Sequence, residues 1–262
     1  MILGSADLPG LSTPSAQMGL GEMVSRRTAP TTDWTDMSHN DHFVQFYESD
    51  DHIVGAVAEY LVHGLRSGDA CIVIATREHV AGIEKLVAAY SDRFEIAVNA
   101  GQYIALDAQE TLDLFMVNGL PDADKFTQGV GTVIQKAAAR GGSLRAFGEM
   151  VGVLCGQGNF DAAVRLEELW NDLQTRFKFS LFCAYSISVL GSRTATERMS
   201  EICSGHSRVI PCESYSSISN TNERLQMIAK LQQKTKQLES ELAEMQRRLA
   251  AKDAAPEILA AA

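Results

Sequence analysis

Between residues 42 and 187 the sequence alternates short apolar runs with stretches of helical period. The runs ACIVIA and FSLFCAY are apolar almost throughout, whereas a half-buried strand would alternate apolar and polar positions. Continuous apolar runs are typical of strands inside a parallel sheet, because helices cover both of its faces. The pattern predicts five strands, at residues 43–47, 70–75, 103–106, 144–147 and 179–185.

Amphipathic helices are predicted between these strands. Ser49 is a suitable N-cap and Gly68 a suitable C-cap for the first helix. Asn159 is expected to cap another helix, and residues 122–140 have a helical period. Strand–helix alternation predicts right-handed βαβ units. We therefore expect one α/β domain over residues 41–187, with a mainly parallel sheet of five or more strands flanked by helices.

The chain on either side of this domain has a different composition. Residues 1–40 hold three of the six prolines and have no sustained period, which predicts a disordered leader. We expect no strand after Tyr185. The sequence there predicts a helical connector over residues 188–220, a coiled coil over residues 221–252 and a frayed tail over residues 253–262.

The predicted coiled coil rests on a heptad repeat. Its a positions are Ile228, Thr235, Leu242 and Leu249, and its d positions are Leu231, Leu238 and Met245. An apolar seam flanked by charged and amide side chains is typical of a parallel two-stranded coil. The polar Thr235 at a central a position weakens the seam, which favours a reversible dimer. The alternative is a single amphipathic helix packed on its own domain.

Composition and charge limit the partners. The chain has 23 Lys and Arg against 33 Asp and Glu, a net charge of −10, which argues against nucleic-acid binding. No apolar stretch approaches the roughly 18–20 residues of a membrane-spanning helix. The five cysteines include no C-x-x-C pair, and no secretion signal is evident, so we expect a cytoplasmic protein. Cys71 and Cys183 are expected to be small buried hydrophobic side chains.

Nucleotide-binding motifs are absent from the sequence. It contains neither G-x-x-x-x-G-K-[ST] nor G-x-G-x-x-G. The first strand is instead followed by the acidic run at residues 48–51, where a phosphate would meet carboxylates rather than bare backbone N–H groups. This argues against conventional nucleoside triphosphate hydrolysis and against Rossmann-type dinucleotide binding.

Candidate ligand-binding residues follow from the sheet. Ligands of open α/β sheets bind outside the carboxyl ends of the strands. Glu149 closes the fourth strand, Arg145 on that strand is either its partner or an outward-facing residue, and Glu167 lies on the next helix. The full candidate set is His42, Tyr47, Glu48, Thr76, Asp107, Arg145, Glu149, Glu167 and Tyr185. No Ser-His-Asp or Cys-His arrangement follows from spacing, so we expect no catalytic residue.

The histidines give no specific metal signal. His39 and His42 are three residues apart, but this spacing is generic, and we interpret both as surface or edge residues. His63 and His79 are expected to be solvated helix residues. We therefore expect neither a metal nor a cofactor.

Several phrases together resemble the MEDS domain, the methanogen/methylotroph DcmR sensory domain. They are DHFVQFYESDDHIVGAVAEYLVHGLRSGDACIVIAT, YIALDAQETLDLFM, RAFGEMV, RLEELWNDL and FSLFCAY, in the family's order. The family is found in DcmR-like regulators and N-terminal in bacterial sensor histidine kinases. The resemblance implies a RecA/KaiC-like fold that has lost the Walker A loop. The segment ICSGHSRVIPCESYSSISNTNERLQMIAKLQQKTKQLESEL is similar to the connector and coiled coil that precede the kinase core in such proteins.

From the residues and the resemblance we expect a non-enzymatic sensory module. It would bind an unknown small molecule, apolar or related to one-carbon compounds by analogy with DcmR, and signal through its coiled-coil stalk. The alternatives are an atypical RecA/KaiC-like ATP-binding protein and a ligand-free dimeric scaffold. The expected partner of the stalk is a second copy of the chain, with a stalk-bearing histidine kinase as the second choice.

Overall fold

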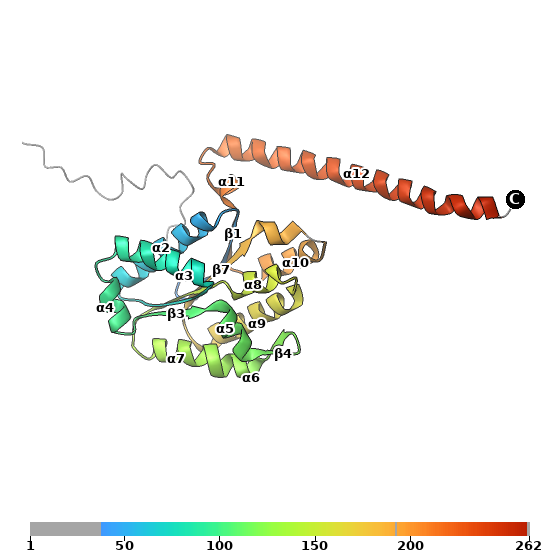
Figure 1. The fold of residues 1–262 in the computed structure, drawn as a ribbon. Helices are drawn as coiled ribbons and strands as arrows, with labels where there is room; N and C mark the ends of the chain where they lie inside the picture. The colour runs from blue at the N-terminus through green and yellow to red at the C-terminus, as the bar shows by residue number, and fades with distance from the viewer. Residues whose placement is uncertain (1–37, 192, 261–262) are drawn as a thin grey trace, which may run out of the picture.

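The computed structural model describes residues 38–191 and 193–260 and contains a six-stranded sheet (Figure 1). The strand order is β3-β2-β6-β7-β1-β8, and every neighbouring pair is parallel. The strands are β1 (His42–Tyr47), β2 (Ala70–Ala75), β3 (Tyr103–Asp107), β6 (Leu144–Gly148), β7 (Ser180–Ser186) and β8 (Arg208–Ile210). The predicted parallel α/β sheet is confirmed, and the five predicted strands lie within a residue or two of their expected bounds.

Helices cover both faces of the sheet, each over its own hydrophobic core (Figure 1). One face carries α2 (Asp50–Ser67), α3 (Arg77–Tyr90) and α4 (Phe94–Asn99). The other carries α5 (Ala108–Phe115), α6 (Ala123–Phe126), α7 (Thr132–Ala138), α8 (Met150–Gly156), α9 (Phe160–Arg176) and α10 (Arg193–Ser204). Burial on both faces explains why β2 is buried at all six positions and lacks polar alternation.

The predicted helix caps are present. The side chain of Ser49 accepts the backbone N–H of His52 at the start of α2. Gly68 ends that helix in the left-handed conformation, with φ 86°, which glycine adopts without steric cost. Asn159 caps α9 by accepting the N–H of Ala162.

The segment predicted as one helix over residues 122–140 is interrupted. α6 and α7 are joined by a π-helical turn, η1 (Thr127–Gly131). A short hairpin of β4 (Met116–Val117) and β5 (Leu120–Pro121) precedes them. Its turn is Asn118-Gly119, with φ 52° and 83°, the left-handed pair that favours a tight hairpin.

The expectation that no strand follows Tyr185 is wrong. After a 3₁₀ turn, η2 (Ile187–Gly191), and α10, the chain returns to the sheet as β8 and pairs with β1. β8 has only three residues, and its two apolar ones, Val209 and Ile210, are too short a run to predict a strand. The sheet therefore continues past the domain end expected at residue 187.

Two further helices follow β8. α11 (Glu213–Ser216) lies beside the end of β1, and α12 (Thr221–Ala260) projects away from the globular part (Figure 1). The described part of the tail expected at 253–262 is helical, in an alanine-rich sequence of high helix propensity. The leader expected at 1–40 lies, apart from its last three residues, outside the described residues. None of the described helices is long and apolar enough to cross a membrane.

Candidate functional site

Three of the predicted site residues meet at the carboxyl edge of the sheet. Glu149, buried after β6, accepts the backbone N–H of Thr76 at 2.9 Å through Oε2. Its Oε1 lies 2.6 Å from Nδ1 of His79, and the His79 ring is 6.4 Å from that of Tyr47. Nε2 of His79 is 3.5 Å from Asp50. His79 is therefore buried and ion-paired, and its expected role as a solvated helix residue is wrong.

The electrostatics of this edge cluster follow from its carboxylates. The hydrogen bond with Glu149 raises the pKa of His79, against the opposing effect of burial. Burial raises the pKa of Tyr47, and the charges of Glu149 and Asp50 raise it further. The edge thus places the His79 ring between two carboxylates, Glu149 and Asp50, which favour its protonated form.

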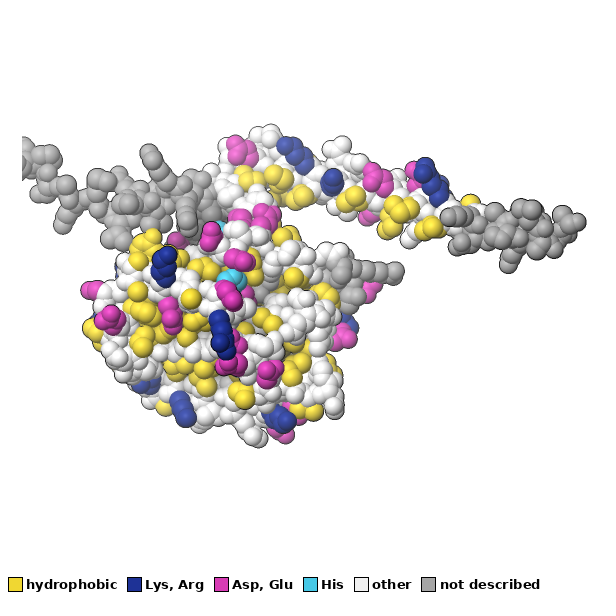
Figure 2. All heavy atoms as spheres, viewed as in Figure 1, with side chains coloured by type: hydrophobic (Ala, Val, Ile, Leu, Met, Phe, Trp, Pro, Cys, Tyr) yellow, Lys and Arg dark blue, Asp and Glu magenta, His cyan; other side chains and the backbone are white. Residues whose placement is uncertain are grey.

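Two other predicted residues at this edge have separate partners. Glu48 accepts hydrogen bonds from Ser214 at 2.7 Å and from the Cys212 thiol at 3.3 Å, and both donors lie at α11. Asp107 pairs with Arg77 at 3.2 Å. Asp107 also lines a shallow hollow of about 190 Å³ with Arg77, Val80, Ala81, Glu84, Ala105 and Leu106. Acidic side chains are prominent on the face shown in Figure 2.

Arg145 does not belong to this edge. It lies near the amino end of β6, where Nε donates to Asp69 at 2.8 Å. Its guanidinium also stacks over the Tyr60 ring, 5.1 Å from the centroid. Arg145 is buried. Of the two roles considered from the sequence, neither a Glu149 partner nor an outward-facing residue is correct, because the side chain is directed into the α2 layer.

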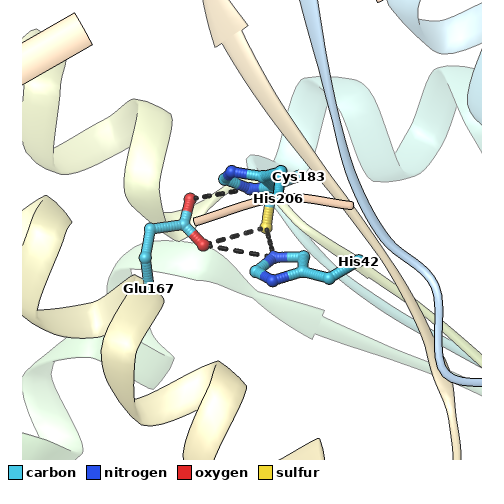
Figure 3. A group of neighbouring side chains, drawn as sticks. All are labelled: His42, Glu167, Cys183 and His206. Carbon is cyan, nitrogen blue, oxygen red and sulfur yellow. Dashed lines mark hydrogen bonds and ion pairs between the residues drawn. The ribbon is translucent and has the colours of Figure 1, made fainter. Parts of the chain in front are cut away.

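The remaining predicted residues lie in a buried polar cluster between the sheet and α9. His42 comes from the start of β1, Cys183 from β7 and Glu167 from α9, and His206 follows α10 (Figure 3). His42 and Cys183 reach the same side of the sheet because side chains alternate between its faces along neighbouring parallel strands. The side chains of His42, Glu167 and His206 are 4%, 6% and 0% exposed, and Cys183 is fully buried.

The polar atoms of this cluster converge. Nε2 of His42 is 3.3 Å from Sγ of Cys183 and 3.2 Å from Oε2 of Glu167. Cys183 Sγ is 3.6 Å from the same Glu167 oxygen, and His206 Nε2 is 3.4 Å from Oε1. One ligand atom from each residue lies within 4.8 Å of the other three. Among the residues that the structure describes, these four side chains form a group that could hold a metal ion.

Hydrogen bonds outside the cluster fix both imidazoles. Nδ1 of His206 lies 2.6 Å from the carbonyl of Ile202, so it donates a proton there. Nδ1 of His42 lies 2.8 Å from Oδ1 of Asn171. The Asn171 amide is oriented because its Nδ2 donates to Gly205, so His42 Nδ1 is also a donor. In each ring Nε2 is therefore the nitrogen that is directed into the cluster.

The carboxylate of Glu167 dominates the charge of the cluster. Burial would raise its pKa, but the neighbouring His206 and His42 lower it on balance. The Tyr185 hydroxyl donates to Oε1 at 2.6 Å, and burial together with the Glu167 charge raises the pKa of Tyr185. The same two effects raise the pKa of the Cys183 thiol. Without a further ligand, the site holds an ionised carboxylate beside a neutral thiol and a neutral phenol.

The sequence therefore identified two of the four cluster residues, His42 and Glu167, and also Tyr185, which binds Glu167. His42 was expected to be a surface or edge residue and is 3% exposed. Cys183 is buried in the hydrophobic core as predicted, but its Sγ also lies against polar groups. His206 was missed, because it lies in a loop and no spacing connects it to residues 23 to 164 positions earlier in the chain.

Comparisons with known proteins identify the globular part. The family model of MEDS, the methanogen/methylotroph DcmR sensory domain, matches residues 41–207, which contain all four residues of the buried cluster. A search of curated proteins finds no similar sequence. Among solved structures, a KaiC-like protein from the hyperthermophilic archaeon Pyrococcus horikoshii is similar at 14% identity. That likeness covers 66% of this chain and 72% of the other, with a TM-score of 0.44.

Proposed function

Because the chain belongs to the MEDS family of sensory domains, we propose that it is a non-catalytic cytoplasmic sensor that binds a small molecule and signals through α12. The proposal has two parts, the binding of a ligand by the α/β domain and the transmission of that event to the stalk. Each part is supported by different contacts.

One contact carries the proposal of transmission. The Glu213 carboxylate of α11 accepts the backbone N–H groups of Glu48 and Ser49, at 2.8 and 2.7 Å. These two residues connect β1 to α2, at the carboxyl edge where ligands of such sheets bind. A ligand that moved this connection would also move the base of the stalk, because only residues 217–220 separate α11 from α12.

The stalk itself presents an apolar stripe. Hydrophobic side chains follow one side of α12, with charged side chains beside them (Figure 2). The seam residues Leu231, Leu238 and Leu242 are 54%, 52% and 55% exposed in the single chain. A heptad stripe of this kind is buried by an equivalent stripe on a second helix. We therefore assign the stripe to a second copy of the chain.

The connection between β1 and α2 gives less support to the ATP-binding alternative than to the sensory proposal. A phosphate at the start of a helix is held by free backbone N–H groups. Here the N–H groups of Glu48 and Ser49, just before α2, already donate to Glu213, and the first turn of α2 begins with Asp50 and Asp51. An added phosphate would have to displace one carboxylate and approach two others.

A thermal-shift screen of the full chain tests the ligand-binding part. The panel comprises small metabolites, short-chain hydrocarbon derivatives and ATP with Mg²⁺. We expect at least one small organic compound to raise Tm, since a ligand at 100 times its Kd stabilises the folded state by about 2.7 kcal/mol. A shift with ATP and Mg²⁺ alone would favour the KaiC-like alternative. A panel without any shift would favour the ligand-free scaffold.

A further inference from the structure

We infer that His42, Glu167, Cys183 and His206 bind one divalent transition-metal ion, for which Zn²⁺ is the best match. This inference goes beyond the sensory role and does not depend on it. It rests on the positions of the four ligand atoms, on the charge of the cluster and on the hydrogen bonds that orient its imidazoles.

The separations between ligand atoms match tetrahedral coordination. Zinc lies about 2.0–2.3 Å from nitrogen, oxygen and sulfur ligands, so neighbouring ligand atoms of a tetrahedron are about 3.3–3.7 Å apart. His42 Nε2 is 3.2 Å from Glu167 Oε2 and 3.3 Å from Cys183 Sγ, and the last two atoms are 3.6 Å apart. His206 Nε2 lies 3.4 Å from the other carboxylate oxygen, Oε1, and within 4.8 Å of a ligand atom of each of the other residues. A movement of the His206 side chain toward Oε2 would complete the tetrahedron.

The donor set selects the kind of metal. Thiolate and imidazole are the ligands of zinc and of other late first-row metals, whereas magnesium and calcium prefer oxygen ligands. Two imidazoles, one thiolate and one carboxylate fill all four positions of a tetrahedral ion. A site with four protein ligands and no open position is typical of a structural metal rather than a catalytic one.

The charges of the ligands suit a divalent ion. As thiolate and carboxylate, Cys183 and Glu167 supply two negative charges in a buried site, where charges are costly unless they are paired. A divalent ion displaces the Cys183 thiol proton to solvent, and the site becomes two positive charges against two negative ones. Binding therefore releases one proton per ion.

The contact between His206 and Glu167 has poor geometry for an ion pair. A charge-assisted N–H···O bond is about 2.7–2.9 Å long, whereas His206 Nε2 and Glu167 Oε1 are 3.4 Å apart. Among the groups that the structure describes, none forms a hydrogen bond with this buried nitrogen. A buried ring nitrogen that lacks a hydrogen bond and is directed at a carboxylate and a thiol is well placed for a metal.

The supporting hydrogen bonds have the pattern of a metal site. Metal-bound histidines donate their second ring N–H to a carbonyl or carboxamide oxygen, which fixes the tautomer and the ring orientation. His206 does so with the carbonyl of Ile202 and His42 with Asn171. The Tyr185 hydroxyl restrains the Glu167 carboxylate in the same way. His42, Glu167 and His206 are thus each held in place by a contact outside the cluster.

Metal loading of the full chain tests the inference. The protein is purified under reducing conditions, stripped with a chelator and dialysed against Zn²⁺, and bound zinc is measured by mass spectrometry. We expect one zinc per chain. We expect Cys183→Ser and His206→Gln to weaken binding at least 10–100-fold, while Cys203→Ser and His39→Gln, which remove a thiol and an imidazole outside the cluster, leave it unchanged.

A cobalt spectrum of the unmodified chain decides the matter if the cluster variants fail to fold. Co²⁺ at this site should give the intense visible absorption of tetrahedral coordination and a thiolate-to-cobalt charge-transfer band. Substoichiometric zinc, an octahedral cobalt spectrum without the thiolate band, or folded Cys183→Ser and His206→Gln variants with undiminished affinity would each overturn the inference. None of these outcomes bears on the ligand screen or on the stalk.

Discussion

Arg145 and Arg77 are both paired with aspartates, but in different surroundings. The side chain of Arg145 is 10% exposed and that of Asp69 is 11% exposed, whereas Arg77 is 74% exposed. Removing one partner of a buried pair leaves an uncompensated charge, which costs about 3–5 kcal/mol. An exposed pair contributes less than about 1 kcal/mol. The Arg145–Asp69 pair is therefore a buried structural ion pair, and the Arg77–Asp107 pair is a surface one.

We expect Arg145→Met to lower the free energy of unfolding by about 3–5 kcal/mol. The same substitution at Arg77 should lower it by less than about 1 kcal/mol. Urea denaturation followed by circular dichroism measures both values. Equal losses in the two variants would show that the Asp69 pair is not desolvated as the structure has it.

The His79–Glu149 pair predicts a pH dependence of stability. The folded pKa of His79 is raised above its unfolded value of about 6.5, chiefly by the hydrogen bond with Glu149. The stabilisation is therefore fully present below about pH 6.5 and is lost as the pH rises through the folded pKa. We expect His79→Gln to destabilise the protein by roughly 1–2 kcal/mol at pH 6 and by less at pH 8.5. Denaturation of both proteins at the two pH values measures this difference, and a loss that grows with pH would contradict it.

The sequence predicts where a residue lies along a strand but not which partner its side chain contacts. The sequence places Glu149 at a strand end, and from there its position at the carboxyl edge follows. The direction of Arg145 depends on Asp69, and no pattern along the chain reports that contact. In the same way, the environment of Cys183 depends on its contact with His42, which lies 141 positions earlier in the chain.

Among the elements, α12 offers the clearest test. We expect Leu238→Asp together with Leu242→Asp to convert a dimer into a monomer, because two charges would be buried in the seam. Gln233→Asp with Ser240→Asp adds the same charge outside the seam and should leave the dimer intact. Sedimentation measures the mass and circular dichroism confirms that the α/β domain remains folded. A dimer that persists in the seam variant would place the interface in the sensory domain.

The predictability of each element follows its length and burial. The five long strands are buried and apolar, so their sequence alone predicts them. β8 has three residues, of which Val209 and Ile210 are apolar, and this run is too short to predict a strand; it pairs along the edge that β1 would otherwise leave open. The β4–β5 hairpin has a readable Asn118-Gly119 turn, but its two-residue strands are too short to show alternation. Tertiary context determines these short elements.

At the scale of the whole molecule, the segment between α10 and the stalk contacts both the buried cluster and β1 before it leaves the α/β domain. His206 reaches into the buried cluster, and the next residue, Ser207, donates its N–H to the carbonyl of His42 at 2.6 Å. β8 then pairs with residues 43–45 of β1, and α11 contacts Glu48 just beyond the end of that strand. The segment that leads to the stalk is therefore attached to one strand at several points.

This attachment also protects the sheet from other chains. An edge strand exposes a row of unpaired N–H and C=O groups, and β1, with its buried apolar residues, would be such an edge without β8. A chain cut after Ser207 retains His206 and every other strand but leaves β1 open. We expect it to associate with increasing concentration in light scattering, whereas a chain cut after Asn220, which keeps β8 and lacks α12, should remain monodisperse. Equal behaviour of the two chains would contradict this. On this account the three residues of β8 prevent β1 from pairing with other chains, so any isolated form of the domain should end beyond Ile210.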